Sequence, residues 1–149
     1  MKVSPDLYQP NGITTGPQTY RIPGGLVGFP EHRSFDLVFV PDQEPFLWLQ
    51  LHGPSPLNFV AIEPQGIIQD YDLELFDEDA EFLGIKESSD AIVLNIVTVR
   101  NNRPDAATVN LTGPVIINRH TGIAKQCIVA NYFKYSAHHP LVASAAAGR

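Results

Sequence analysis

The sequence contains a single cysteine, Cys127, among 149 residues. One cysteine excludes an intrachain disulfide and a zinc site built from several thiolates. Because Cys127 falls in an apolar run, we expect it to be a small buried hydrophobe rather than a nucleophile. No run reaches the ~20 apolar residues that span a bilayer, and residues 1–16 lack the apolar core of a signal peptide. These absences predict a soluble cytoplasmic protein that does not contact membranes.

Basic residues are also scarce. The chain has 10 Lys and Arg against 16 Asp and Glu, which gives a formal net charge of −6. Non-specific nucleic-acid binding needs Lys and Arg to displace counterions from phosphates, so this charge argues against direct binding to nucleic acid. It permits a basic protein partner.

Motifs for catalysis and metal binding are missing as well. The five histidines form no HExxH or comparable spacing, and the adjacent His138 and His139 would point to opposite faces of a strand. There is no GxSxG elbow and no phosphate-binding GKS or GKT. The sequence therefore predicts no enzyme, no metal site and no cofactor. A small-ligand-binding β-barrel, or an enzyme that uses His138, His139 and Asp residues, remains as an alternative.

Short apolar runs separated by turn residues are abundant. Thirteen prolines and eleven glycines favour turns over long helices. The runs recur every 8–12 residues or so, which is typical of a sandwich or barrel. We therefore predict an all-β fold, a compact antiparallel β-barrel-like or sandwich domain with one or two short helices. The expected strands cover residues 35–40, 46–51, 57–62, 72–76, 91–99, 107–111, 115–118 and 126–130.

The pattern also predicts boundaries. Residues 1–18 lack periodicity and are expected to form a flexible leader, residues 19–142 a single domain, and residues 143–149 a disordered tail. One helix is expected to start at Asp77 as N-cap and to close at Gly84, with Phe82 and Leu83 anchoring it to the sheet.

Four strand details follow from the local sequence. Residues 46–51 are expected to be buried on nearly both faces, and residues 91–99 to form a central strand whose Asn95 needs a hydrogen-bond partner. Gly113 and Pro114 interrupt the stretch TVNLTGPVIIN, residues 108–118. We expect this structural turn to bend or break the strand and close the sheet on itself, with Asn110 and Asn118 bonding to backbone across the corner. Residues 118–126 are expected to form a hairpin with His120, Thr121 and Gly122 at the turn.

The most distinctive stretch is acidic. Residues 70–90 contain nine acidic residues and one lysine, a net charge of −8, whereas the rest of the chain has nine basic and seven acidic residues and carries +2. Strand alternation would place Asp70, Asp72 and Glu74 on one face. Two interpretations remain: a solvated edge strand guarded by charge, or a docking patch for a basic partner.

Six segments in series resemble one known family. They are GLVGFPEHRSFDLV (25–38), EPFLWLQLHGPSPLNFVAIEP (44–64), DYDLEL (70–75), IVTV (96–99), TVNLTGPVIIN (108–118) and KYSAHHPL (134–141). Together they resemble the flagellar assembly factor FliW family over roughly residues 19–142. The resemblance implies a compact β-barrel-like protein without enzymatic activity that binds flagellin in the cytoplasm. It further implies that the protein antagonises a CsrA-type translational repressor. Flagellin translation would then be coupled to flagellin secretion.

This resemblance gives the acidic stretch a candidate partner, because an RNA-binding repressor needs a basic face. A flagellin-only chaperone is the alternative within the family, and both the sharing of one site by the two partners and the oligomeric state stay open. The candidate contacts combine acids with apolar side chains that would supply affinity. They are Asp70, Tyr71, Asp72, Glu74, Phe76, Asp77, Glu78, Asp79 and Tyr135.

Overall fold

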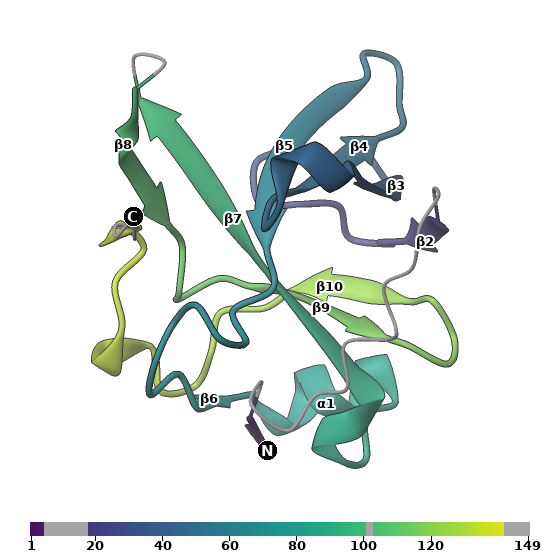
Figure 1. Cartoon of the computed structure of the whole chain (residues 1–149). Coiled ribbons are helices and arrows are strands. Elements are labelled where there is room, and N and C mark those ends of the chain that lie inside the picture. Colours follow the sequence, from purple (N-terminus) through teal and green to yellow (C-terminus); the bar gives the residue numbers. More distant parts are fainter. Residues whose placement is uncertain (5–17, 101–102, 142–149) are drawn as a thin grey trace.

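A computed structural model describes residues 1–4, 18–100 and 103–141 (Figure 1). Its strands are β1 (Lys2–Val3), β2 (Gln18–Arg21), β3 (Ser34–Phe39), β4 (Leu47–Leu51), β5 (Leu57–Ile62), β6 (Leu73–Glu74), β7 (Ala91–Arg100), β8 (Arg103–Val109), β9 (Val115–Asn118), β10 (Ala124–Gln126) and β11 (His139–Pro140). The helices are α1 (Asp77–Leu83) and the 3-10 turns η3 (Pro41–Gln43), η4 (Ser88–Asp90) and η5 (Tyr132–Lys134). Among the described residues, no helix has the length and apolar character needed to cross a membrane.

The strands form one large antiparallel sheet and one small pair. The large sheet has the order β10-β9-β7-β5-β4-β3-β2, and β8 joins it by pairing with β7 and β11. The small sheet pairs β1 with β6. The all-β fold predicted from the spacing of apolar runs is thus confirmed, and α1 is a single short helix of seven residues.

The ten-residue strand β7 is the centre of the fold (Figure 1). Its residues alternate between two cores, with Ile92 and Leu94 in one and Val93 and Val97 in the other. Asn95 is fully buried, and its Nδ2 donates to the Tyr71 hydroxyl at 3.0 Å and to the Asn110 carbonyl at 2.9 Å. The central strand and the partner expected for Asn95 are both confirmed.

Strand β4 differs from the prediction. Leu47, Leu49 and Leu51 are buried, but Trp48 is half-buried and Gln50 is exposed. Only one face of this strand is fully buried; on the other face, Trp48 borders a surface groove and Gln50 is exposed. The sequence suggested two buried faces since Trp48 is apolar although it stands at the surface.

The helix start was also predicted incorrectly. Phe76, with φ −61° and ψ 147°, is the N-cap, and Asp77 is already the first helical residue. Leu83 is buried, but Phe82 is 54% exposed because it lies about 100° around the helix from its neighbour. The predicted end is confirmed, since Gly84 adopts a left-handed φ of 72° and its N–H bonds back to the last turn.

The strand expected at residues 126–130 is displaced toward the N-terminus, and β10 ends at Gln126. The next backbone N–H groups bond to the preceding loop instead of β9: Cys127 to Pro114 O at 2.9 Å and Val129 to Thr112 O at 3.0 Å. Cys127 is nonetheless buried, and burial raises its pKa to about 12, as expected for a packing residue. The preceding hairpin is as predicted, with Gly122 at φ 77°.

The Gly113–Pro114 interruption lies between two successive partners of β7. Before it, Val109 pairs with Val97; after it, Val115 pairs with Leu94. Asn110 Oδ1 holds the turn together by accepting the N–H of Thr112 at 3.0 Å and of Gly113 at 2.9 Å. A Cβ on Gly113 would come within 3.3 Å of the Asn110 carboxamide, so the close turn favours glycine.

The interruption does not close the sheet, contrary to our expectation. The ends of the strand order approach each other, since Arg21 donates its N–H to Gly122 O at 2.9 Å and forms one isolated bridge with Ile123. No ladder joins β2 to β10 in the described part of the chain, so the sheet is barrel-like and open. Asn118, expected at this corner, bonds instead to the end of α1.

The first residues of the expected leader belong to the fold. Lys2 pairs with Glu74 and Val3 with Leu73, and Val3 is buried. Two-residue pairing with a distant strand leaves no periodic signal in the sequence, which explains the error. The remainder of that leader, residues 5–17, and the expected tail, residues 143–149, lie outside the described residues.

Candidate functional site

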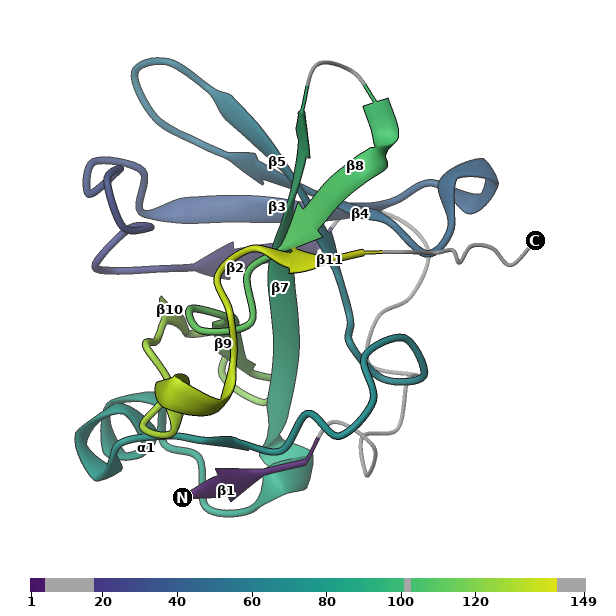
Figure 2. The same ribbon diagram turned by 90° about the vertical axis from the view of Figure 1, so that its left-hand side faces the viewer.

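The acidic strand β6 is held by its backbone on two sides. On one side it pairs with β1 (Figure 2). On the other, Glu74 O accepts the Ala130 N–H at 2.6 Å, and the Asn131 side chain receives the Glu74 N–H at 2.9 Å and donates to Asp72 O at 2.9 Å. Because these bonds use main-chain atoms, the carboxylates of Asp72 and Glu74 stay available at the surface.

The predicted alternation of faces is present. Asp70, Asp72 and Glu74 are exposed, whereas the intervening residues 71, 73 and 75 are buried. Asp70 has a positive φ of 59°, a conformation that Asp tolerates better than most residues. The three carboxylates line one surface hollow of about 450 Å³. We call it the acidic hollow; its lining consists of Lys2, Asp70, Asp72, Glu74, Asn131, Lys134 and Tyr135.

Two lysines moderate the charge of this hollow. Lys2 and Lys134 line it together with the three acids, so its own net charge is much smaller than that of residues 70–90. Among the described residues, no ion pair or hydrogen bond engages the side-chain carboxylates of Asp70, Asp72 and Glu74. As far as the described part of the chain is concerned, they are available to cationic groups.

Two predicted contacts lie inside the protein. Tyr71 is 2% exposed, and its hydroxyl donates to Leu111 O at 2.6 Å; burial raises its pKa. Asp79 is buried and paired with Lys125, whose pKa the Asp79 carboxylate raises. Neither side chain is exposed at the surface, so we remove both from the candidate contacts. Sequence alternation had already placed Tyr71 on the inner face, whereas the partner of Asp79 lies 46 residues away.

The other predicted residues lie at or near the surface. Phe76 is 44% exposed, and Asp77 and Glu78 are exposed at the start of α1. Tyr135 is half-buried: its ring packs edge-on against Tyr71 at 4.9 Å, and its hydroxyl bonds to both main-chain groups of Asp72 at 3.0–3.1 Å. Tyr135 thus holds the acidic strand in place through the Asp72 main chain, and only part of its side chain is exposed for contact with a partner.

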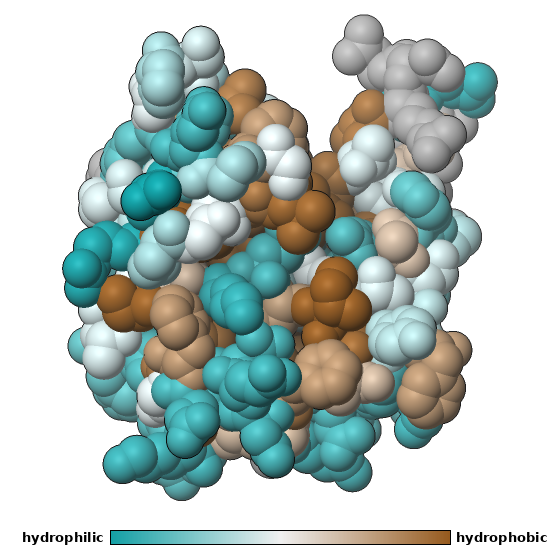
Figure 3. Space-filling model, turned by 180° about the vertical axis from the view of Figure 1, so that it is seen from behind, coloured by the Kyte–Doolittle hydropathy of each residue, from teal (hydrophilic) through white to brown (hydrophobic). Residues whose placement is uncertain are grey.

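Exposed aromatic residues beside the hollow were missed. Tyr132 and Phe133 in η5 are 54% and 76% exposed and stack edge-to-face at 6.3 Å. They precede Lys134, which lines the acidic hollow. Figure 3 shows hydrophobic side chains next to hydrophilic ones on the face seen from behind. The signal was the run Tyr-Phe-Lys-Tyr at 132–135, which is unusually aromatic for a segment without strand alternation.

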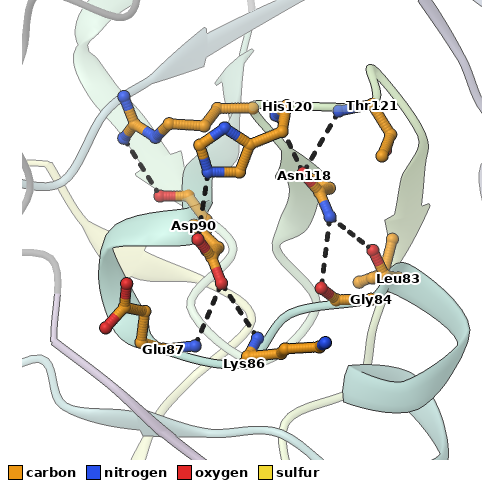
Figure 4. Close-up of polar contacts among 10 residues, drawn as sticks. Leu83, Gly84, Lys86, Glu87, Asp90, Asn118, His120 and Thr121 are labelled. Carbon is orange, nitrogen blue, oxygen red and sulfur yellow. Dashed lines mark hydrogen bonds and ion pairs between the residues drawn. The ribbon is translucent and has the colours of Figure 1, made fainter.

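A polar network fixes the opposite end of the acidic stretch (Figure 4). Asp90 Oδ2 accepts the main-chain N–H groups of Lys86 at 3.0 Å and Glu87 at 3.1 Å, and its Oδ1 lies 3.0 Å from His120 Nε2. The Lys86 N–H, together with that of Glu87 and with His120, lowers the Asp90 pKa. Asp90 is therefore a structural carboxylate that joins η4 to the β9–β10 hairpin.

This network predicts a pH dependence. A carboxyl with a lowered folded pKa contributes stability above its unfolded value, 3.8 for Asp90, and loses it as pH falls through the folded value. Asp90→Asn keeps an oxygen that accepts hydrogen bonds but removes the charge, so it is expected to lower the free energy of unfolding by about 1 kcal/mol at pH 7, the usual difference between a charged and a neutral hydrogen bond. The difference from wild type should shrink below pH 3.8.

Urea denaturation at pH 7 and pH 3 checks this expectation. The matched control is Asp72→Asn, whose exposed carboxylate accepts no hydrogen bond from a described residue. An Asp90→Asn difference as large at pH 3 as at pH 7 would show that the Asp90 charge does not hold the network together.

Among the described residues, no group of three or more His, Cys, Asp or Glu side chains is arranged to hold a metal ion.

This β domain, with its charged and aromatic surface features, is similar to known flagellar assembly factors. A crystal structure of the flagellar assembly factor FliW superimposes with a TM-score of 0.71 at 35% identity, covering 83% of this chain and 84% of that one.

Sequence relatives agree. The flagellar assembly factor FliW of Leptospira biflexa is 36% identical over 74% of this chain and 72% of its own length. Those of Natranaerobius thermophilus and Desulfitobacterium hafniense are 39% and 37% identical, covering 80% and 89% of this chain and 78% and 86% of their own. The FliW protein family model matches residues 13–141. The chain belongs to the FliW family, which confirms the resemblance noted in the sequence.

Proposed function

We propose that this chain is a non-enzymatic flagellar assembly factor of the cytoplasm that binds flagellin and antagonises a CsrA-type translational repressor. The observation that carries the proposal is the family match over residues 13–141, shared with relatives named flagellar assembly factors. The two ligands would compete for one pool of protein. When flagellin is exported, the freed factor captures the repressor, and flagellin translation resumes by mass action.

The acidic hollow supports the assignment of the repressor to this surface. A repressor that binds RNA needs Lys and Arg for the phosphates, and such a face is attracted to exposed carboxylates. Asp70, Asp72 and Glu74 offer them from a strand whose backbone is already fixed. The start of α1, with Asp77 and Glu78, extends the same charge.

Affinity requires more than charge, because exposed ion pairs contribute little free energy. Aromatic side chains usually dominate protein interfaces. Phe76, Tyr132 and Phe133 are exposed close in sequence to residues that line or hold the acidic hollow. We propose that they supply apolar contacts and that Asp70, Asp72 and Glu74 guide the basic partner to them.

Calorimetric titration tests the proposed function. The protein is titrated with flagellin, then with the CsrA-type repressor of the same organism, and then with each in the presence of the other. We expect binding to both, with one partner weakening the other. Binding to flagellin alone would leave a chaperone without translational control. Binding to neither, together with a thermal shift from a small metabolite, would favour the ligand-binding alternative.

A further inference from the structure

A second candidate surface, distinct from the acidic hollow, lies on the sheet face around Val97. In the sheet, Trp48 pairs with Val60, Val60 with Val97, and Val97 with Val109, so these four side chains share one face. Strand β5 pairs with β7 only at residues 95–97 of β7. Beyond Val97 the β4–β5 arm and the β7–β8 arm diverge (Figures 1 and 2).

The divergence opens an apolar groove of about 610 Å³. One wall carries Phe46, Trp48 and Val60, and the other carries Val99, Ala107 and Leu141; Asp42, Gln43 and Glu44, in and after η3, form a lip. Its lining shares no residue with that of the acidic hollow. Within the described part of the chain, the only charged side chains that line the groove are the two acids of the lip.

The walls restrict what fits between them. They are side chains from one sheet face, and main-chain N–H and C=O groups point along a sheet rather than out of its face. An extended strand would need the main-chain edges of β5 and β7, which no ladder joins beyond Val97 in the described part of the chain. The groove itself is lined by side chains, and a helix can lie on them because it satisfies its own backbone hydrogen bonds. Apolar walls select an apolar stripe, and the acidic lip selects Lys or Arg beside it.

We propose that this groove binds an amphipathic helix of a partner protein, with aliphatic side chains between the two arms and Lys or Arg next to Asp42 and Glu44. The proposal rests on the proposed function in one respect, that the partner is a protein. It adds a docking site separate from the acidic hollow. The two surfaces differ in chemistry: the acidic hollow offers charge and nearby aromatic side chains, and the groove offers apolar walls for a helix.

Trp48 provides a direct readout, because it is the only tryptophan of the chain and lines the groove. Its indole N–H already donates to Gln43 Oε1 at 2.7 Å. The probe is a synthetic, tryptophan-free amphipathic helix with a leucine stripe flanked by lysines. We expect a saturable blue shift of Trp48 emission, and about tenfold or greater weakening when glutamates replace the lysines, since like charges then meet at the lip.

Two variants locate the site. Val99→Glu puts a charge on the groove wall at a residue that is 42% exposed and thus tolerant of substitution. It should weaken peptide binding by about tenfold or more. Val27→Glu is the matched control: it is the same substitution at a 70% exposed valine outside the groove, and it should leave peptide binding unchanged. Asp42→Lys with Glu44→Lys should invert the preference, so that the glutamate-flanked peptide binds better. Circular dichroism and thermal unfolding confirm that each variant is folded.

Three results would overturn the proposal: no saturable change in Trp48 emission, equal affinity for the lysine and glutamate peptides, or binding that Val27→Glu abolishes and Val99→Glu does not. These results are distinct from failure of the proposed function. That failure is a wild-type protein that binds neither flagellin nor the repressor in calorimetry, whatever the peptide does.

Discussion

Asn118→Ala is expected to lower the free energy of unfolding by about 2–4 kcal/mol, because the buried Leu83 carbonyl and two partly buried main-chain N–H groups would lose their partner at once. The Asn118 side chain is buried and bonds in two directions (Figure 4). Its Nδ2 donates to Leu83 O at 2.8 Å at the end of α1, and its Oδ1 accepts the N–H groups of His120 at 2.8 Å and Thr121 at 3.2 Å. One side chain thus connects the helix to the β9–β10 hairpin.

Urea denaturation of the variant measures this effect. Asn58→Ala is the matched control, since Asn58 is exposed on β5, and it should change stability by no more than about 0.5 kcal/mol, as surface substitutions usually do. A loss below about 1 kcal/mol for Asn118→Ala would mean that water replaces the carboxamide and that the bonds to α1 contribute little net stability.

The role of Asn118 shows that local sequence patterns predict a strand but not the long-range partners of its side chains. The strand that it ends, β9, follows from the run Val115–Asn118, because β-branched residues bounded by turns predict strands well. The partner of its side chain lies 35 residues earlier, at Leu83, and no local pattern encodes that distance. The pairing of Asp79 with Lys125 escaped prediction for the same reason.

The candidate site likewise contains features that the local sequence predicted and features that it did not. Alternation in residues 70–75 predicted which carboxylates face solvent, because side-chain direction along an extended segment is a local property. The groove beside Trp48 was not predicted, since it depends on where β5 and β7 stop pairing. Trp48 is apolar in any local pattern, and only the divergence of two arms leaves it half-buried.

The second large effect concerns encounter with a basic partner. Asp72→Lys combined with Glu74→Lys is expected to slow association with the CsrA-type repressor by about tenfold or more at low ionic strength, where steering by charge is strongest. The salt dependence of the association rate should weaken in parallel, because the attraction being screened has been removed. Both side chains are exposed and engaged by no described partner, so the fold should be unaffected.

Stopped-flow or surface-based kinetics across a range of salt concentrations measures both effects. Asp72→Lys alone is compared with Glu31→Lys, which changes the net charge equally at an exposed acidic residue outside the acidic hollow. If the rates fall equally, the net charge of −6 governs encounter and the hollow has no special role. If only Asp72→Lys slows association, attraction acts locally at β6, where the fixed backbone holds both carboxylates at the surface. An unchanged rate at low salt for the double variant would remove the acidic hollow from the repressor's binding surface.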